Sequence, residues 1–259
     1  MYRRYCSLLL TVLFVLGIGA RPQRPRILTA TEQGIVNDGK TLNTESIQRA
    51  IDRLAEQGGG TLRFTPGCYL TGGIVLKSGV ELLVEHGAVI SGSTNPEHYR
   101  SLIASEARDN STMALIMADK VQDIAIMGSG LINGNGRELA LTIDSLLNLP
   151  TAENQQGPRS RRRASEPLRP KLMFISNSEN VRVEGLRLLN SACWGLSFHS
   201  CRQVDIHDIE FENRAYWNND GIDITDCHDV TIRRCDINSA DDGICLKSYD
   251  LMALKLRQY

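Results

Sequence analysis

The chain has 259 residues, of which 42% are hydrophobic and 23% charged, and this balance excludes a disordered tail, a fibrous repeat and a miniprotein held together by disulfides. Its 29 basic and 30 acidic residues give a formal net charge of −1, so no overall field draws it to nucleic acid or to a membrane surface. The 22 glycines outnumber the 5 Phe, 7 Tyr and 2 Trp together, which favours short strands joined by tight turns over a helical bundle.

The amino terminus has the pattern of a signal peptide. Arg3 and Arg4 precede an apolar run over 8–18, which ends in small residues suited to cleavage. The run is shorter than the roughly 20 residues that span a bilayer, so a cleaved signal over 1–20 is favoured over a membrane anchor. We therefore expect a secreted or periplasmic protein whose single domain, 21–259, is not attached to a membrane.

One amphipathic helix is predicted near the start of this domain. Between Thr44 and Gln57 the apolar residues recur at helical spacing, and three glycines at 58–60 end the pattern. The residues of the apolar face are Ile47, Ala50, Ile51, Leu54 and Ala55.

Beyond residue 60 the pattern changes to short alternating segments that repeat. Each copy has two inward-facing apolar residues two positions apart, and a second such pair begins eight residues after the first. The six copies are Ile74/Leu76 with Leu82/Val84, Ile116 with Ile124/Ile126, Met173/Ile175 with Val181/Val183, Leu196/Phe198 with Val204/Ile206, Ile222/Ile224 with Val230/Ile232, and finally Ile244/Leu246. The last four start at 173, 196, 222 and 244, which are 23, 26 and 22 residues apart, and such a period indicates a solenoid.

The repeat predicts an all-β fold, a parallel β-helix. A single copy holds too few apolar residues to make a core, but stacked copies with strands about 4.8 Å apart enclose a continuous one. The helix over 44–57 would cover the first coil, because an open end exposes apolar surface and unpaired strand edges.

The stretch 137–170 does not fit the repeat and is predicted to be an irregular insertion. Its arginines either attract an acidic polymer or belong to a solvated loop; they are Arg159, Arg161, Arg162 and Arg163.

Three aspartates gather at the turn where successive copies begin. Asp220 and Asp242 each stand immediately before a glycine and the first inward residue, 22 residues apart, and Asp241 is the neighbour of Asp242. Stacking of the coils would place these carboxylates together, where mutual repulsion raises the pKa of at least one of them and makes acid and base chemistry available. The alternatives are ordinary turn formation by Asp and a calcium site.

The outward face of the same strands is predicted to line a groove. The equivalent positions along it are His199, Thr225 and Lys247, and then Ser197, Asp223 and Cys245. Lys247 either pairs with a substrate carboxylate or is an ordinary solvated lysine, and Trp194 either stacks on a sugar ring or packs in a turn. Cys201 and Cys227 are equivalent too, so they form a disulfide or lie as stacked free thiols.

Two phrases around the aspartates resemble the signatures of a known family. Asn218–Asp223 reads N-N-D-G-I-D and 240–244 reads A-D-D-G-I, similar to the N-x-D and D-D motifs of glycoside hydrolase family 28, the polygalacturonases. Supporting phrases are N-S-A-C-W over 190–194, I-N-G-N-G over 132–136 and S-T-N-P over 93–96. The resemblance covers roughly residues 36 to 250.

The resemblance implies a right-handed, pectin-lyase-like parallel β-helix that hydrolyses α-1,4 bonds between galacturonic acid units of pectin, with inversion and with no cofactor or metal. By position, Asp241 matches the general acid, while Asp220 and Asp242 match the carboxylates that activate water. Asn218, Asp223 and Lys247 are expected to bind the pectic substrate. The complete domain is expected to be a monomer.

The sequence departs from that family in two motifs. The family has a G-H-G and an R-x-K motif downstream of the D-D pair, and this chain has neither, while its last copy of the repeat lacks a second half. We therefore expect a C-terminally truncated product with little or no turnover. The alternative to an active enzyme is a catalytically inactive β-helix remnant that binds polysaccharide weakly at most.

Overall fold

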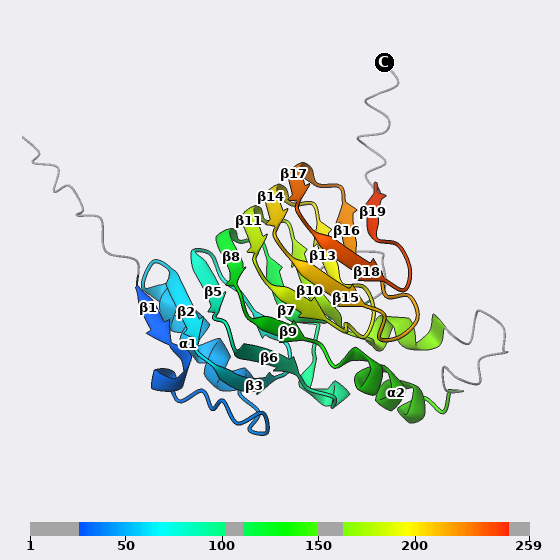
Figure 1. The fold of residues 1–259 in the computed structure, drawn as a ribbon, viewed down its shortest axis with the longest axis horizontal. Coiled ribbons are helices and arrows are strands. Elements are labelled where there is room, and N and C mark those ends of the chain that lie inside the picture. Colours follow the sequence, from blue (N-terminus) through cyan, green and yellow to red (C-terminus); the bar gives the residue numbers. More distant parts are fainter. Residues whose placement is uncertain (1–25, 102–110, 150–162, 249–259) are drawn as a thin grey trace, which may run out of the picture.

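The computed structural model describes residues 26–101, 111–149 and 163–248, and within these ranges the chain winds through three parallel sheets (Figure 1). Sheet 1 contains β1 (Ile27–Thr29), β2 (Gly60–Phe64), β5 (Val80–Val84), β8 (Gln122–Gly128), β11 (Glu179–Glu184), β14 (Arg202–His207) and β17 (His228–Arg233). Sheet 2 contains β4 (Ile74–Val75), β7 (Ala114–Asp119), β10 (Lys171–Ser176), β13 (Leu196–His199), β16 (Ile222–Thr225) and β19 (Ile244–Lys247). Sheet 3 contains β3 (Gly67–Thr71), β6 (Ala88–Gly92), β9 (Leu131–Asn133), β12 (Arg187–Leu189), β15 (Glu210–Asn213) and β18 (Asp236–Ser239). This is the predicted parallel β-helix.

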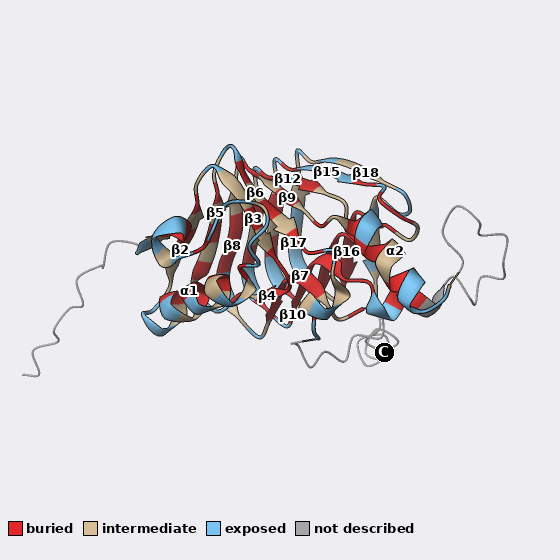
Figure 2. Ribbon diagram, turned by 90° about the horizontal axis from the view of Figure 1, so that it is seen from below, coloured by how far each residue is buried: buried red, intermediate tan, exposed pale blue. Residues whose placement is uncertain are grey.

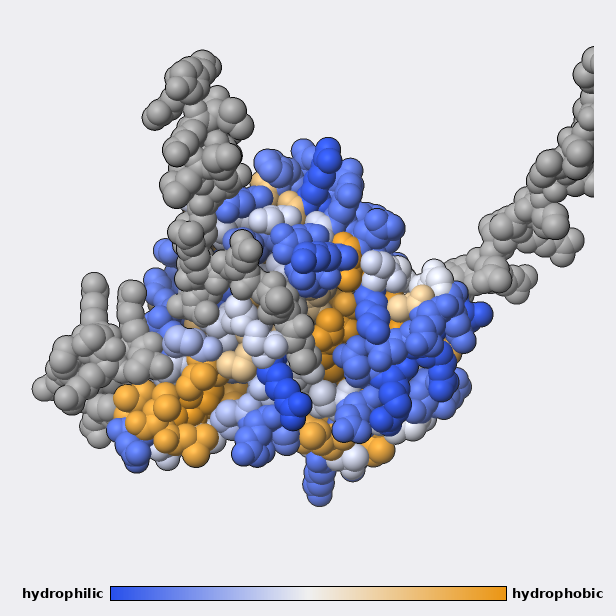
Figure 3. All heavy atoms as spheres, turned by 180° about the vertical axis from the view of Figure 1, so that it is seen from behind, coloured by the Kyte–Doolittle hydropathy of each residue, from blue (hydrophilic) through white to orange (hydrophobic). Residues whose placement is uncertain are grey.

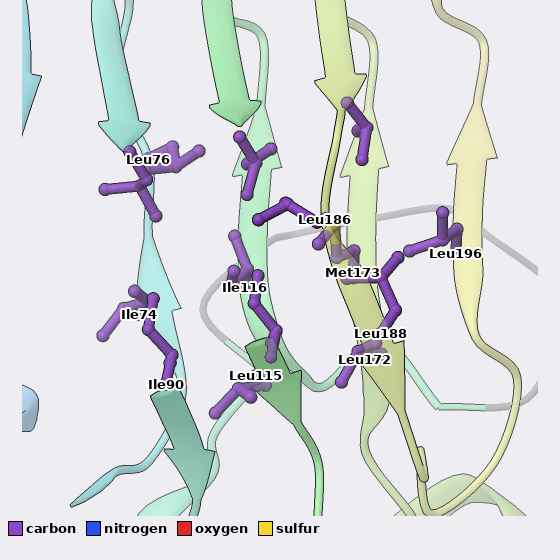
Figure 4. Packing of buried hydrophobic residues seen from close by; sticks show 14 of the residues in the cluster. Ile74, Leu76, Ile90, Leu115, Ile116, Leu172, Met173, Leu186, Leu188 and Leu196 are labelled. Atoms are coloured by element: carbon purple, nitrogen blue, oxygen red, sulfur yellow. The ribbon is translucent and has the colours of Figure 1, made fainter. Parts of the chain in front are cut away.

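The core lies inside the coils, where like residues stack on one another. In sheet 2 the first inward residues pair strand by strand as predicted, and Figure 4 shows several of them pointing into the interior between the strands. Figure 2 shows the buried residues following the strands from β2 to β16, whereas β17, β18 and β19 of the last described coil have no buried residue. Sheet 3 adds one large inward apolar residue per coil, which the paired pattern did not predict. These residues are Tyr69, Ile90, Ile132, Leu188, Phe211 and Ile237.

The register differs from the predicted one in sheet 1 at the step from β5 to β8. The sequence pattern matched Leu82 with Ile124, but Leu82 pairs with Ile126 and Val84 pairs with Gly128. A side chain at Gly128 would overlap the carbonyl oxygen of Val84, so only glycine fits there. A glycine at an inward position does not appear in a pattern of apolar residues. The predicted register between β5 and β8 was therefore wrong by two residues.

In four coils the chain leaves sheet 2 at a residue in the left-handed conformation, and a second left-handed residue follows three positions later, in the strand of sheet 1. The first residues of these pairs are Lys120, Asn177, Ser200 and Asp226, with φ of 54°, 48°, 51° and 50°. Each donates its backbone N–H to the next coil, as Asn177 does to the His199 oxygen at 2.8 Å. Left-handed conformations suit short polar residues such as Asn and Asp, which explains the polar residues between the apolar strands.

Helix α1 (Thr44–Glu56) covers the first coil, as predicted. It buries Ile47, Ile51 and Leu54 and contacts β2, β4 and β5. Strand β1 and the 3₁₀ helix η1 (Ala30–Gln33) were not predicted. Pairing of β1 with β2 extends sheet 1 by one strand, so the helix and a strand together close this end.

The insertion is more regular than predicted. Its first part is helix α2 (Gly136–Leu146), which buries Leu139, Ala140 and Ile143 at helical spacing, and its last part is the 3₁₀ helix η4 (Arg163–Leu168). Another 3₁₀ helix, η2 (Pro96–His98), lies near α2. Figure 3 shows hydrophobic surface over α2, where Leu146 is exposed.

The side chains of the arginine cluster lie outside the described residues, as does the predicted signal over 1–20. In the part of the chain that the structure describes, no helix has both the length and the hydropathy to cross a bilayer.

The cysteines among the described residues are free thiols. Cys201 and Cys227 stack as predicted, and the Cys201 N–H donates to the Cys227 Sγ at 3.3 Å. Their thiols donate to the carbonyl oxygens of Ile175 at 3.4 Å and Thr225 at 3.2 Å, respectively. We therefore expect a reducing agent to leave the melting temperature unchanged in calorimetry. A lower melting temperature under reducing conditions would indicate a disulfide instead.

Candidate active site

The turns that precede β13, β16 and β19 lie next to one another and hold Asp220 between its neighbours. The Gly221 N–H donates to the Asp242 carbonyl oxygen at 2.8 Å, and the Gly195 N–H donates to the Asp220 carbonyl oxygen at 2.9 Å. Asp220 and Asp242 therefore occupy the same position in adjacent coils, as the spacing of the repeat predicts.

Asp241 lies close to Asp220, while the carboxylate of Asp242 contacts a different neighbour. The Asp241 N–H donates to the Asn219 carbonyl oxygen at 3.3 Å, and its negative charge helps to raise the pKa of Asp220. The Asp242 carboxylate accepts a hydrogen bond from the Cys245 thiol, whose pKa it helps to raise. Both Asp241 and Asp242 are exposed, so a ligand in solvent can reach them.

Asp220, in the turn, lies beside Asp223 of β16, which sequence reasoning did not predict. Asp220 is 4% exposed and Asp223 is fully buried. Burial, followed by the charge of Asp223, raises the pKa of Asp220 to about 8. The raised pKa favours the protonated form of Asp220 near neutral pH, and the adjacent Asp223 carboxylate stabilises that form. Repulsion among the aspartates was expected to raise the pKa of at least one of them. The charge of Asp241 does so for Asp220, but burial and Asp223, which were not predicted, contribute more.

Lys247 is paired inside the protein rather than solvated. Its Nζ lies 2.8 Å from Asp223 Oδ1 and 3.2 Å from the centre of the Trp194 ring, and its side chain is 17% exposed. Burial raises the pKa of Asp223, and the ammonium group of Lys247 opposes this increase. Trp194 is 7% exposed, so of the two alternatives for it the structure has the packed one.

Lys171 is a buried cation of this site that sequence reasoning missed. Its Nζ donates to Ser197 Oγ at 3.2 Å and lies 4.7 Å from the Trp194 ring centre. The register of sheet 2 places Lys171, Trp194, Asp220 and Asp242 at one position of four successive coils. Extending the alignment of the aspartates back by two coils would have found it.

Two buried asparagines fix the backbone of the turn, and they were also missed. The Asn219 Nδ2 donates to the carbonyl oxygens of Ser191 at 2.8 Å and Cys193 at 2.7 Å, while its Oδ1 accepts from the Tyr216 N–H at 2.7 Å. Asn213 donates to the Asp220 carbonyl oxygen at 2.7 Å. These bonds satisfy groups that burial would otherwise leave unpaired, so Asp220 is held at a fixed place.

The remaining predicted residues lie around this turn. Asn218 is half-buried with a left-handed backbone, φ 58°, two residues before Asp220. His199 and Thr225 are equivalent to Lys247 in sheet 2, as predicted. Across the described ranges, no group of three or more His, Cys, Asp or Glu side chains is placed to hold a metal ion.

Comparison with known proteins relates this arrangement to one family. The sequence model of the family "Glycosyl hydrolases family 28" matches residues 75–257. The chain is 28% identical to a "Probable polygalacturonase" of Vitis vinifera, over 92% of this chain and 47% of the relative. It is 26% identical to an "Exo-poly-alpha-D-galacturonosidase" of Dickeya chrysanthemi, over 85% and 42%.

Among solved structures, an exopolygalacturonase from Thermotoga maritima is similar, with a TM-score of 0.74 and 30% identity over 88% of this chain and 56% of that one. The chain spans about half the length of the curated relatives that it matches. The family match covers most of the coils and both turns that carry the aspartates. The chain belongs to glycosyl hydrolase family 28.

Proposed function

We propose that this chain acts on pectic polysaccharide as a polygalacturonase, hydrolysing α-1,4 bonds between galacturonate units with inversion. The observation that supports this most is the hydrogen-bonded contact between the Asp220 and Asp242 turns, which brings Asp241 within electrostatic reach of a buried Asp220. Family membership and the names of the relatives support the same substrate class.

In this proposal Asp241 is the general acid. It is exposed, so a glycosidic oxygen can approach it and take its proton. Asp220 and Asp242 activate water on the opposite face of the sugar ring, which in inverting enzymes requires acid and base roughly 6.5–9.5 Å apart. Since the pKa of Asp220 is raised to about 8, its base form becomes more abundant as pH increases towards 8. Activity that instead falls through pH 8 would assign Asp220 as a proton donor.

Asn218, Asp223 and Lys247 are proposed to line the substrate subsite. An ammonium group has three donors, so the contact of Lys247 with Asp223 leaves donors for a uronate carboxylate. The apolar pattern over 1–20 supports export, with the mature chain secreted or periplasmic and acting as a monomer.

Release of reducing ends from polygalacturonate tests the proposal, with calcium removed by a chelator. We expect Asp241→Asn to lower the rate about a hundredfold, the lower end of what a general acid contributes, since solvent reaches this site. Asp236→Asn is the matched control, because Asp236 is an exposed carboxylate at the start of β18 in sheet 3. It should leave the rate unchanged.

The inactive remnant is the alternative function. Wild-type protein that is folded by circular dichroism and releases no reducing ends would contradict the enzyme. Retention of that protein on a polygalacturonate column would then favour a binding role, and passage through the column would leave neither role supported. Equal rates for wild type and Asp241→Asn would contradict the assignment of the acid.

A further inference from the structure

Arg169 is a fully buried cation that the proposed reaction does not use. It follows η4 at the end of the insertion, directly before β10, and its side chain is 0% exposed. A guanidinium group stays charged in proteins, so its burial without full pairing is energetically unfavourable. Its position inside the protein therefore requires an explanation in terms of what it contacts.

The contacts of Arg169 join two successive turns. Nη1 donates to the carbonyl oxygen of Ala192 at 3.1 Å and to that of Trp217 at 3.0 Å. The guanidinium carbon lies 4.0 Å from the centre of the Trp217 ring and 5.3 Å from that of Tyr216. Ala192 and Trp217 precede β13 and β16, and Trp217 stands three residues before Asp220.

A second contact ties the same segment to α2. The Tyr216 hydroxyl donates to Asp144, a buried residue of that helix. Arg169 and Asp144 both belong to the insertion, and their hydrogen-bond partners, Trp217 and Tyr216, are adjacent in sequence. The insertion and the turn that carries Asp220 form one packed unit.

The pairing of Arg169 is incomplete, which argues against a role in stability alone. Glu166 is its ion-pair partner at 4.0 Å, whereas Nε and Nη2 have no hydrogen-bond partner among the described residues. Buried charges that are imperfectly paired are often replaced by apolar residues with no loss of stability. What an apolar residue would not supply is the bridge between two carbonyl oxygens.

We propose that Arg169 is a positioning residue that holds the segment 216–220 and thereby sets the place of Asp220. It acts through Trp217, with its planar guanidinium bonded to the Trp217 carbonyl oxygen and stacked on the indole ring. The catalytic consequence rests on the proposed function, but the structural consequence does not.

Hydrogen–deuterium exchange of the amides of 216–220 tests this without any need for activity. We expect Arg169→Met to speed exchange there at least about tenfold, while exchange in β5 and β6 stays as in the wild type. Arg169→Lys should give an intermediate rate, because an ammonium group can donate to one carbonyl oxygen but cannot form the planar bridge. If Arg169→Met does not fold, the lysine variant alone carries the comparison with wild type.

The matched control is Ile132→Ala in β9, which makes a cavity in the core away from this segment. It should lower the melting temperature and leave exchange at 216–220 unchanged.

Where the wild type hydrolyses polygalacturonate, Arg169→Lys should lower kcat at least about tenfold and change KM less than twofold. Unchanged exchange at 216–220 in both arginine variants, or an equal increase along the whole chain, would overturn the proposal. Absence of hydrolysis would count only against the proposed function.

Discussion

Replacement of Asp220 by Asn is expected to stabilise the folded protein at neutral pH and to remove its hydrolytic activity. Asn has the shape of the protonated carboxyl group and, like that form, places no negative charge beside Asp223. It cannot ionise, so it cannot activate water. We expect the hydrolysis rate to fall between about 10²- and 10⁴-fold.

The gain in stability has a definite dependence on pH. The pKa of Asp220 is about 8 in the folded protein and 3.8 for a free carboxyl group, so between these values the folded state binds more protons than the unfolded state. The free energy of unfolding of the wild type therefore falls as pH rises from about 4 to 8. The Asn variant lacks this fall, and by pH 8 we expect it to be more stable than wild type by on the order of 2 kcal/mol.

Urea denaturation at several pH values measures this difference. At pH 4 the two proteins should have nearly equal stability, and the gap should open as pH increases and stop opening above pH 8. Asp236→Asn, which changes an exposed carboxylate, should differ from wild type by less than about 0.5 kcal/mol throughout. Parallel curves for wild type and Asp220→Asn would contradict the raised pKa.

Gly221→Ala is expected to destabilise the folded protein strongly, although it adds only one methyl group. The new Cβ would overlap the carbonyl oxygen of Gly243 and lie 2.6 Å from Ile237 Cγ2. Relief of this overlap must separate the two turns, because the oxygen belongs to the backbone of the next coil. We expect a loss of about 3 kcal/mol, measured by urea denaturation, and a displaced Asp220.

The repeat itself provides the control for this prediction. Gly243 is equivalent to Gly221, but among the described residues a Cβ built on it meets only Ser239 Oγ, at 4.0 Å. Gly243→Ala should therefore change stability by less than about 1 kcal/mol. A similar loss for both variants would show that the two glycines are needed for their backbone conformation and not for close packing.

The fold could be predicted from sequence where each coil contributes a pair of inward residues. Sheets 1 and 2 have such pairs from β4 and β5 onward, so those strands were found, whereas β1 and β2 of sheet 1 were not. Sheet 3 contributes one large inward apolar residue per coil on strands as short as Leu131–Asn133, and a single apolar residue such as Ile132 does not make a periodic pattern. Register failed at Gly128 because close approach of two backbones leaves no signal in hydropathy.

The sequence predicted which site residues lie together only where those residues occupy the same position of the repeat. Asp220 and Asp242 were placed together because strand register follows from spacing. The pairing of Asp220 with Asp223 could not be predicted, since one lies in a turn and the other on a strand, and alternation along strands does not relate them. Lys171 was missed because a column that mixes a cation, an aromatic ring and carboxylates has no common residue type to mark it.

The bridge made by Arg169 limits how this solenoid can be recombined. Coils of a β-helix contact mainly their neighbours, so a chimera of two relatives joined at any turn would be expected to fold. Arg169 and Trp217 are 48 residues apart in sequence and are nevertheless one unit. A junction between 170 and 216 takes the arginine from one parent and the tryptophan from the other. Crossover points in this interval are therefore expected to yield well-folded chimeras with a misplaced Asp220, whereas junctions before 136 keep the insertion and its turn together.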